Sequence, residues 1–406
     1  MLSESSSTPR PYLNSHARGL AWLLTQQSPC GAWAIPMPNH NSIPSVAFTS
    51  LCVVALGSQQ TNERQSAVAW VLSNQGEDGG FGEGPDGQLF RPYATALAIR
   101  ALHKTDPWRY QKNIQNAVDS LIAMQAVAGV HRGGIGAGML ELFPEGVVYR
   151  RPFAHPATTA YAAEALRDAG LSLEHRFWRR CAAFFRGWHN LDLISRKNPE
   201  IYATLTDHGF RLSGDGGLFF VRISGEAWDE FSGARDDRTR TVASTGGATC
   251  QGLIGYLCAG LPTSSLEVQN ARAWLLANYS ATEHSGYAAA VARDQRRLTP
   301  AEPPNALENP GQTGVYQYFR FMAKALSLLE ERADPIGTFN PKGTGHDWAD
   351  DIAEQLVKRQ RPDGAWTNPN PRWLEDEAPL ATVFAVLTWN LLLHRQQRVM
   401  LATKTP

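Results

Sequence analysis

The carboxylates with the clearest chemical potential lie in a short acidic run, Glu375-Asp376-Glu377, just before a helix-like stretch near the C-terminus. Asp207 and Asp215 add two more from a long connecting segment. If folding buries such groups near one another, one pKa rises and a protonated carboxyl is left that can donate a proton. We therefore take Asp376, Glu377 and Asp207 as candidate acid catalysts.

Basic side chains stand at or just before two other helix-like stretches. They are Arg91, Arg150, Arg151 and His155. Helix N-termini attract anions, so this group, with Arg238 and Arg240, could bind a diphosphate or carboxylate head group. Each side chain alone is equally consistent with a solvated surface charge. We expect Arg91 and Arg151 to bind substrate, and we count His155 among the catalytic candidates.

Aromatic residues recur in the stretches that we expect to face the interior. They are Tyr93, Tyr161, Tyr316, Tyr318 and Phe384. Because the face of an aromatic ring attracts cations, these residues could bind substrate and stabilise a carbocation. Core packing explains each of them about as well, so both roles stay open.

The elements that position these residues are marked by a repeated pattern, Gln-x3-Gly-x-aromatic. It occurs at Gln27 to Trp33, at Gln75 to Phe81 and at Gln360 to Trp366. Each copy follows a stretch with apolar residues three and four apart, which predicts an amphipathic helix. The glycine permits positive φ and ends the helix, while the glutamine amide can bond to the turn backbone. We interpret the pattern as structural and assign it no chemistry.

Two kinds of helix alternate along the chain. Stretches rich in small residues begin near residues 43, 91, 155, 244, 314 and 378, and their composition predicts close packing on several sides. The more charged helices are expected outside, near 16–26, 63–74, 112–125, 174–188, 266–279 and 347–360. Six outer and inner pairs close a ring, so we predict an all-α fold, a single (α/α)6 toroid. One domain spans 1–406, with flexible ends at 1–12 and 397–406.

The connections from outer to inner helices are unequal in length. Four are long, at 126–154, 189–243, 280–312 and 367–377. All such connections share one rim of a ring of hairpins, and long loops in a compact domain are usually functional. We therefore expect the site beneath them, at the starts of the inner helices.

The extended pattern Arg18-Gly19-x-x-Trp22-Leu23-x3-Gln27-x3-Gly31-x-Trp33 resembles the QW repeat of squalene-hopene and oxidosqualene cyclases. The β subunits of protein prenyltransferases share the ring fold of that repeat. The resemblance implies a toroid with a central apolar cavity suited to isoprenoid chains, and it does not by itself imply a reaction. We expect an isoprenoid-processing enzyme acting on a small apolar or prenyl-type substrate.

The chain departs from both families at the residues that carry chemistry. It lacks the Asp-x-Asp-Asp acid of the cyclases, and the nearest run, Asp347 to Asp351, is expected to cap an outer helix. Cys250 and His155 are too few for the zinc set of the prenyltransferases. We expect no cofactor and no bound metal, with Mg or Zn as minor options. The alternatives are non-catalytic binding of an apolar or carboxylated ligand, and a lyase or hydrolase reaction on the same ring.

Composition excludes several other classes. Lys plus Arg number 38 and so do Asp plus Glu, so no net field favours nucleic acid. No stretch approaches a membrane span and no signal peptide begins the sequence, so we expect no transmembrane segment and a cytoplasmic location. The five cysteines do not form a metal or disulfide pattern. No feature indicates an oligomeric state.

Overall fold

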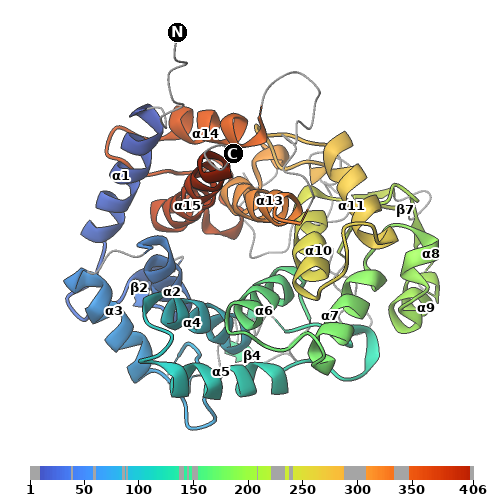
Figure 1. The fold of residues 1–406 in the computed structure, drawn as a ribbon, viewed down its shortest axis with the longest axis horizontal. Helices are drawn as coiled ribbons and strands as arrows, with labels where there is room; N and C mark the ends of the chain where they lie inside the picture. Colours follow the sequence, from blue (N-terminus) through green and yellow to red (C-terminus); the bar gives the residue numbers. More distant parts are fainter. Residues whose placement is uncertain are drawn as a thin grey trace.

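The computed structural model describes residues 10–37, 40–57, 61–84, 87, 90–136, 141–143, 146–148, 154–207, 209–220, 234–236, 241–287, 308–332 and 347–402. Six inner helices form a closed ring in which each packs against the next and the last returns to the first (Figure 1). They are α2 (Val46–Ala55), α4 (Arg91–Thr105), α6 (Pro156–Asp168), α10 (Gly246–Cys258), α13 (Val315–Glu330) and α15 (Ala378–Ala402).

Six outer helices surround this ring, and each packs against the inner helices beside it. They are α1 (Arg10–Thr25), α3 (Asn62–Ser73), α5 (Gln111–Ala123), α7 (Arg176–Gly187), α11 (Leu266–Ala277) and α14 (Trp348–Arg359). The predicted fold class, an all-α toroid of six outer and inner helix pairs, is confirmed. Helix α1 begins at Arg10 and α15 continues to Ala402, so both extend into segments expected to be flexible.

Small residues allow the inner helices to pack closely, and α10 shows this most clearly. Every residue of α10 is buried. A Cβ added at Gly255 would lie 2.0 Å from the ring of Phe185 on α7, and one added at Gly252 would lie 2.2 Å from Leu218. A larger side chain would force these elements apart.

The short elements lie in the outer-to-inner connections. Among them are the hairpins β1 (Ala34–Met37) with β2 (His40–Pro44) and β3 (Glu141–Phe143) with β4 (Gly146–Val148), and a sheet in the order β5 (Arg211–Leu212), β7 (Thr241–Ala243), β6 (Ala234–Asp236). The short helices are α8 (Asp192–Ser195), α9 (Pro199–Asp207), η1 (Gly129–His131), η3 (Pro310–Gln312) and η4 (Arg372–Leu374).

The repeated glutamine joins neighbouring hairpins. Nε2 of Gln75 donates to the carbonyl of Gly79 at 2.9 Å, inside its own turn, and to that of Asn113 on α5 at 3.0 Å. Gln360 repeats this with Gly364 at 2.8 Å and with Ser15 on α1 at 2.9 Å. The second bond links the last outer helix to the first, so the motif also closes the ring.

A threonine in the first turns of five inner helices completes each turn. Its Oγ1 accepts the N–H of the residue two positions after the turn glycine, at 2.9 to 3.0 Å. The threonines are Thr49, Thr95, Thr159, Thr249 and Thr382. At the equivalent position of α13 stands Tyr318, whose hydroxyl lies 3.1 Å from Oγ of Ser285.

Candidate functional site

Side chains from inner helices that are not neighbours in the ring meet in its lumen. Helices α6 and α13 are separated in the ring order by α10, yet Glu164 on α6 and Arg320 on α13 form a bidentate ion pair at 2.6 and 2.7 Å. One turn away, the rings of Tyr161 on α6 and Phe321 on α13 have centroids 5.1 Å apart. Both contacts require side chains that point inward, so they span the lumen at mid-height.

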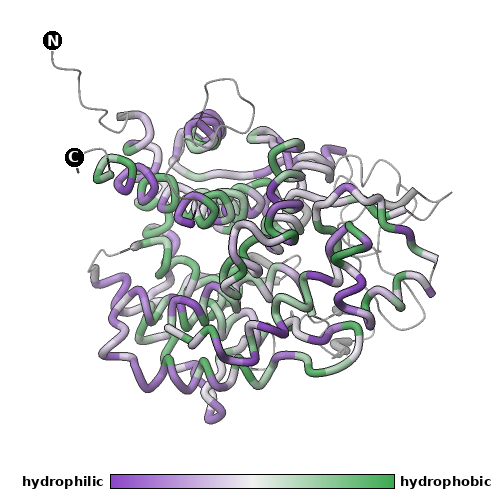
Figure 2. The backbone as a smooth tube through the Cα atoms, turned by 45° about the vertical axis from the view of Figure 1, so that its right-hand side comes forward, coloured by the Kyte–Doolittle hydropathy of each residue, from purple (hydrophilic) through white to green (hydrophobic). Residues whose placement is uncertain are grey.

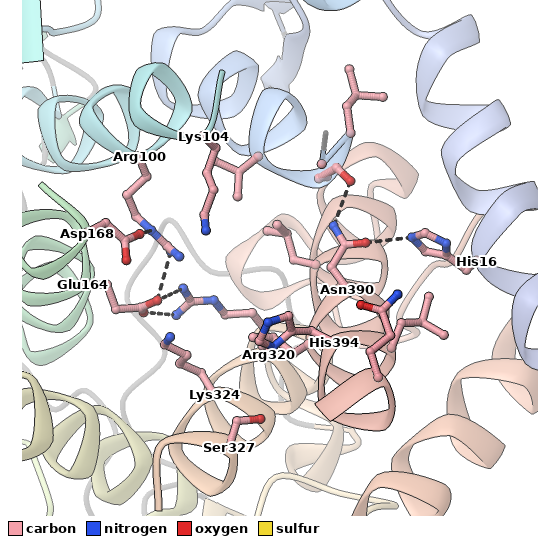
Figure 3. Close-up of a pocket in the computed structure, with 18 of the residues that line it drawn as sticks. His16, Arg100, Lys104, Glu164, Asp168, Arg320, Lys324, Ser327, Asn390 and His394 are labelled. Atoms are coloured by element: carbon pink, nitrogen blue, oxygen red, sulfur yellow. Dashed lines mark hydrogen bonds and ion pairs between the residues drawn. The ribbon is translucent and has the colours of Figure 1, made fainter. Parts of the chain in front are cut away.

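The ion pair continues into a buried network (Figure 3). Nη1 of Arg100 lies 3.0 Å from Oε2 of Glu164, and its Nε donates to Oδ2 of Asp168 at 3.1 Å. Burial alone would raise the pKa of Glu164, but Arg100 and Arg320 hold it below the usual value. Asp168 is likewise held below its usual pKa, against its burial, by Arg100, Lys324 and Lys104. Both carboxylates are therefore ionised at neutral pH.

Aromatic rings cover the guanidinium of Arg320. Its Cζ lies 4.5 Å from the ring centroid of Tyr161 and 5.0 Å from that of Phe321. Tyr93 extends the layer, since its ring packs edge-on against Tyr161 at 5.3 Å. The rings of Tyr161 and Phe321 are thus already in cation–π contact with Arg320.

A cavity of about 590 Å³ lies beside this network, toward the C-terminal ends of the inner helices. One wall is charged and comes from α4, α6 and α13; it includes Arg100, Lys104, Glu164, Asp168, Arg320 and Lys324. The other wall comes from α1, α2 and α15 and is mainly aliphatic; it includes Leu20, Val54, Leu56, Leu387 and Leu391, with the polar side chains of His16, Asn390, His394 and Gln397 among them. The volume is within the range of small-molecule sites, and the paired and unpaired charges lie mainly on the first wall.

A hydrogen-bonded seam closes the apolar side, where α15 meets α2. Nε2 of His16 on α1 lies 2.8 Å from Oδ1 of Asn390 on α15, and Nδ2 of Asn390 donates to the carbonyl of Ala55 at 2.8 Å. Burial lowers the pKa of His16 below its usual value, which favours the neutral imidazole at neutral pH. His16 therefore ties three helices together without adding charge.

This cavity is at the end of the ring opposite to the starts of the inner helices, where the sequence predicted the site. That prediction was based on the lengths of the connections. Connection length does not indicate whether charged residues near the C-terminal ends of the helices meet in a cavity. Much of the long connections lies outside the described residues, so a site beneath them stays a prediction.

The acidic run before α15 turns one carboxylate inward. Glu375 is fully buried, whereas Asp376 is exposed and Glu377 is half-buried. The Glu375 carboxylate accepts the backbone N–H of Gln317 at 2.8 Å and of Tyr316 at 3.2 Å, and Nδ2 of Asn368 donates to it at 2.7 Å. Burial raises its pKa to about 7, although these bonds oppose the rise. The sequence pointed to the acidic run, but we took Asp376 and Glu377 rather than Glu375 as the candidate acids. In a non-helical turn, no periodic pattern indicates which side chain is buried.

The other catalytic candidates are dispersed. Asp207 is exposed at the end of α9. His155 caps its own helix, with Nδ1 accepting the N–H of Ala157 at 3.1 Å, and its ring packs on Phe220 at 5.0 Å. The structure does not bring Asp207 or His155 into the 590 Å³ cavity.

The substrate-binding candidates separate into three groups. Tyr93 and Tyr161 meet in the lumen, as described above. Tyr318 stacks on His284 at 4.6 Å, and the hydroxyl of Tyr316 donates to the carbonyl of Thr367 at 3.2 Å, so both pack against rim connections. Phe384 is buried on α15. Arg91 donates to the carbonyl of Gly87 at 2.7 Å and pairs with Asp78. Arg151 lies outside the described residues, as do Arg150, Arg238 and Arg240.

Metal ligands are not gathered anywhere in the described ranges, where no three His, Cys, Asp or Glu side chains are placed to hold an ion. Burial raises the pKa of the Cys250 thiol above its usual value, which disfavours a thiolate ligand. Across the same ranges, no helix is both long enough and apolar enough to cross a membrane.

Comparison with known proteins gives likenesses in structure only. No protein-family model matches the chain, and no curated protein matches it. The type II terpene cyclase MstE from Scytonema, in complex with geranylgeranyl dihydroxybenzoate, matches with a TM-score of 0.47 and 14% identity, over 95% of this chain and 97% of that one. The GH76A alpha-1,6-mannanase from Salegentibacter also has a TM-score of 0.47, with 11% identity over 94% and 99%. A protein from Actinoplanes follows at 0.42, with 12% identity over 94% and 99%.

The chain is thus similar to a terpene cyclase and to a mannanase, both at TM-scores below 0.5. The toroid itself is established by the closed ring of helix contacts, independently of these likenesses. No substrate and no residue role is transferred from either protein.

Proposed function

We propose that the chain is an isoprenoid-processing enzyme that takes a prenyl-type amphiphile into the 590 Å³ cavity. The observation that carries this proposal is the division of the cavity into an apolar and a charged wall. An amphiphile with one apolar chain and one polar end matches such a division, whereas a fully polar oligomer would leave the leucine wall in contact with polar groups.

The apolar wall supplies the binding energy for the chain. Leu387, Leu391, Leu20 and Val54 come from three helices and present aliphatic side chains only. Each methylene buried against such a surface contributes about 0.8 kcal/mol. A prenyl chain therefore gains affinity along its length, and the charged wall fixes its orientation.

Proton donation in this proposal does not come from the cavity carboxylates, and the acidic run before α15 lies at the other end of the ring, outside the cavity lining. Arginine partners keep Glu164 and Asp168 ionised, so neither holds a proton to donate. Glu375 has a pKa of about 7 and the pKa of Asp376 is also raised by burial, so both favour the protonated acid more than usual. Asp376, Glu377, Asp207 and His155 remain candidates for catalysis from the sequence, and neither they nor Glu375 line the cavity.

One observation favours a second candidate, binding of a carboxylated apolar ligand without turnover. The faces of Tyr161 and Phe321 lie against the guanidinium of Arg320, and a carbocation at the same faces would meet like charge. The two candidates share the cavity and differ only in whether a product forms.

The test is incubation with squalene, with prenyl diphosphates and with the corresponding alcohols, followed by mass spectrometry and by direct binding measurements. Leu391→Asp places a charge on the apolar wall, while Leu401→Asp changes an exposed leucine of the same helix and is the matched control. We expect Leu391→Asp to weaken binding at least about tenfold, or about 1.4 kcal/mol, and Leu401→Asp to have no effect.

A new product supports the enzyme, and binding without product supports the second candidate. The proposal of this cavity fails if none of the compounds binds, or if both leucine variants bind them as the wild type does.

A further inference from the structure

Two lysines of the cavity are left over when its ion pairs are assigned. Each carboxylate on the cavity wall has an arginine partner. Glu164 pairs with Arg100 and Arg320, Asp168 with Arg100, and Glu331 with Arg398 at 3.0 Å. Within the described part of the chain, neither Lys104 nor Lys324 forms an ion pair.

The two ammonium groups face the same space from different helices. Lys104 is in the last turns of α4 and Lys324 in the middle of α13, and these helices are not neighbours in the ring. Both lysines line the cavity, where the end of Lys104 lies beside Arg100 and that of Lys324 lies beside Glu164 (Figure 3). Both also help to lower the pKa of Asp168, which places their charges near one carboxylate.

The charge balance of the cavity defines the ligand that would neutralise it. With Arg398 included as the partner of Glu331, five cationic side chains stand against three carboxylates, while His16 and His394 have lowered pKa values. The surplus is two positive charges, and it resides on the lysines because the arginines are paired. A dianion matches this surplus, whereas a monocarboxylate would leave one charge unmatched.

We propose that Lys104 and Lys324 form a binding site for a dianionic phosphate-type group, which bridges α4 and α13 across the mouth of the lumen. Ammonium groups bind phosphate as point charges, without the fixed fork geometry of arginine. The phosphate group belongs either to free inorganic phosphate or to the head of the prenyl-type ligand, and only the latter source rests on the proposed function.

The direct test is titration calorimetry with inorganic phosphate, pyrophosphate and acetate at constant ionic strength. The variants are Lys104→Ala, at an exposed position, and Lys324→Ala, at a half-buried one, and the matched control is Lys112→Ala, an exposed lysine of α5 that does not line the cavity. We expect the wild type and Lys112→Ala to bind phosphate or pyrophosphate more tightly than acetate, and each cavity variant to bind at least about tenfold more weakly. Lys104→Arg should retain binding, because it conserves the charge.

A second arm identifies the source of the phosphate group by comparing a prenyl diphosphate with its alcohol. If the diphosphate binds more tightly than the alcohol, and both cavity variants lose this difference, the lysines bind the diphosphate head group. If pyrophosphate binds in a lysine-dependent way and no prenyl compound binds, the anion site stands and the proposed function fails. If prenyl compounds bind regardless of head group and of both lysines, the anion site is wrong and the proposed function stands. Phosphate and pyrophosphate that do not bind, or that bind the cavity variants as well as Lys112→Ala, also overturn the inference.

Discussion

Arg320 on α13 and Glu164 on α6 meet in the lumen, where Nη2 of Arg320 donates to Oε2 of Glu164 at 2.7 Å and its Nη1 lies 2.6 Å from Oε1. Because α10 separates their helices in the ring, this pair links α6 and α13 through the lumen (Figure 3). The cavity lies beside this pair, toward the C-terminal ends of the inner helices. Figure 2 shows inner helices in which hydrophobic residues dominate, so the buried charges are exceptions in an apolar surrounding.

Replacing the carboxylate of this pair should be strongly destabilising. Glu164→Gln leaves Arg100 and Arg320 buried without their shared counter-charge, and breaking a buried pair typically costs about 3 to 5 kcal/mol. The free energy of unfolding from urea titration measures this loss. The control is Glu200→Gln, which removes a more exposed partner of Arg132 at 3.2 Å and should cost less than about 1 kcal/mol. Equal effects of the two variants would show that the lumen pair has no special weight.

The threonine at each turn should also have a measurable effect. Thr382→Val removes the Oγ1 that accepts the buried N–H of Trp366 at 3.0 Å, and an orphaned buried donor costs about 1 to 3 kcal/mol. Thr25→Val changes an exposed threonine whose hydroxyl donates to the carbonyl of Trp22 and accepts from the exposed side chain of Gln26, and it should cost less than about 0.5 kcal/mol. Urea unfolding of both variants separates them. A Thr382→Val protein as stable as Thr25→Val would remove the threonine from the account of the repeat.

Two buried groups at the rim should act on stability in opposite directions as pH changes. The pKa of Glu375 rises from 4.5 to about 7 by burial, so its contribution to stability is present at low pH and is lost as pH rises from 4.5 to 7. The pKa of His284 falls from 6.5 to about 4 by burial, so its contribution is present above pH 6.5 and is lost as pH falls toward 4. Each changes the free energy of unfolding by about 1.4 kcal/mol per pH unit, so the two offset one another between pH 4.5 and 6.5.

Single substitutions should expose each slope. Relative to the wild type, Glu375→Gln should lose stability as the solution is acidified, because only the His284 contribution remains. His284→Gln should gain stability under the same change. Urea unfolding at several pH values provides the measurement, and slopes of the same sign in both variants would contradict the assignment.

Much of the fold could be predicted because its signal is local and repeated. The spacing of Gln360 and Gly364 predicts a turn, and the positions of the flanking helices follow from that turn. A fourth copy of the turn does not match the sequence pattern, because its glutamine and glycine are eight residues apart instead of four. Gln125 donates to the carbonyl of Gly133 and also to that of Phe177 on α7, as the other glutamines do in their repeats. The extra residues lengthen the turn without changing its hydrogen bonds.

The candidate site was harder to predict because its contacts are long-range. Glu164 and Arg320 are 156 residues apart, and no spacing rule relates them. Lys104 and Lys324 look like ordinary helix lysines until the ring brings them to one cavity. Tyr318 illustrates the converse case: its type suggested ligand contact, whereas its position is that of the turn threonine in the other repeats.

The most direct test of the account is to locate a bound prenyl chain. A farnesyl diphosphate analogue with a photoreactive diazirine on the chain would be crosslinked to the protein and mapped by peptide mass spectrometry. We predict labels on residues 54–57 of α2 and its C-terminal turn and on residues 387–393 of α15, which form the apolar wall, with loss of these labels in Leu391→Asp and not in Leu401→Asp. Labels confined to other segments, unchanged by Leu391→Asp, would contradict the claim that this cavity holds the substrate.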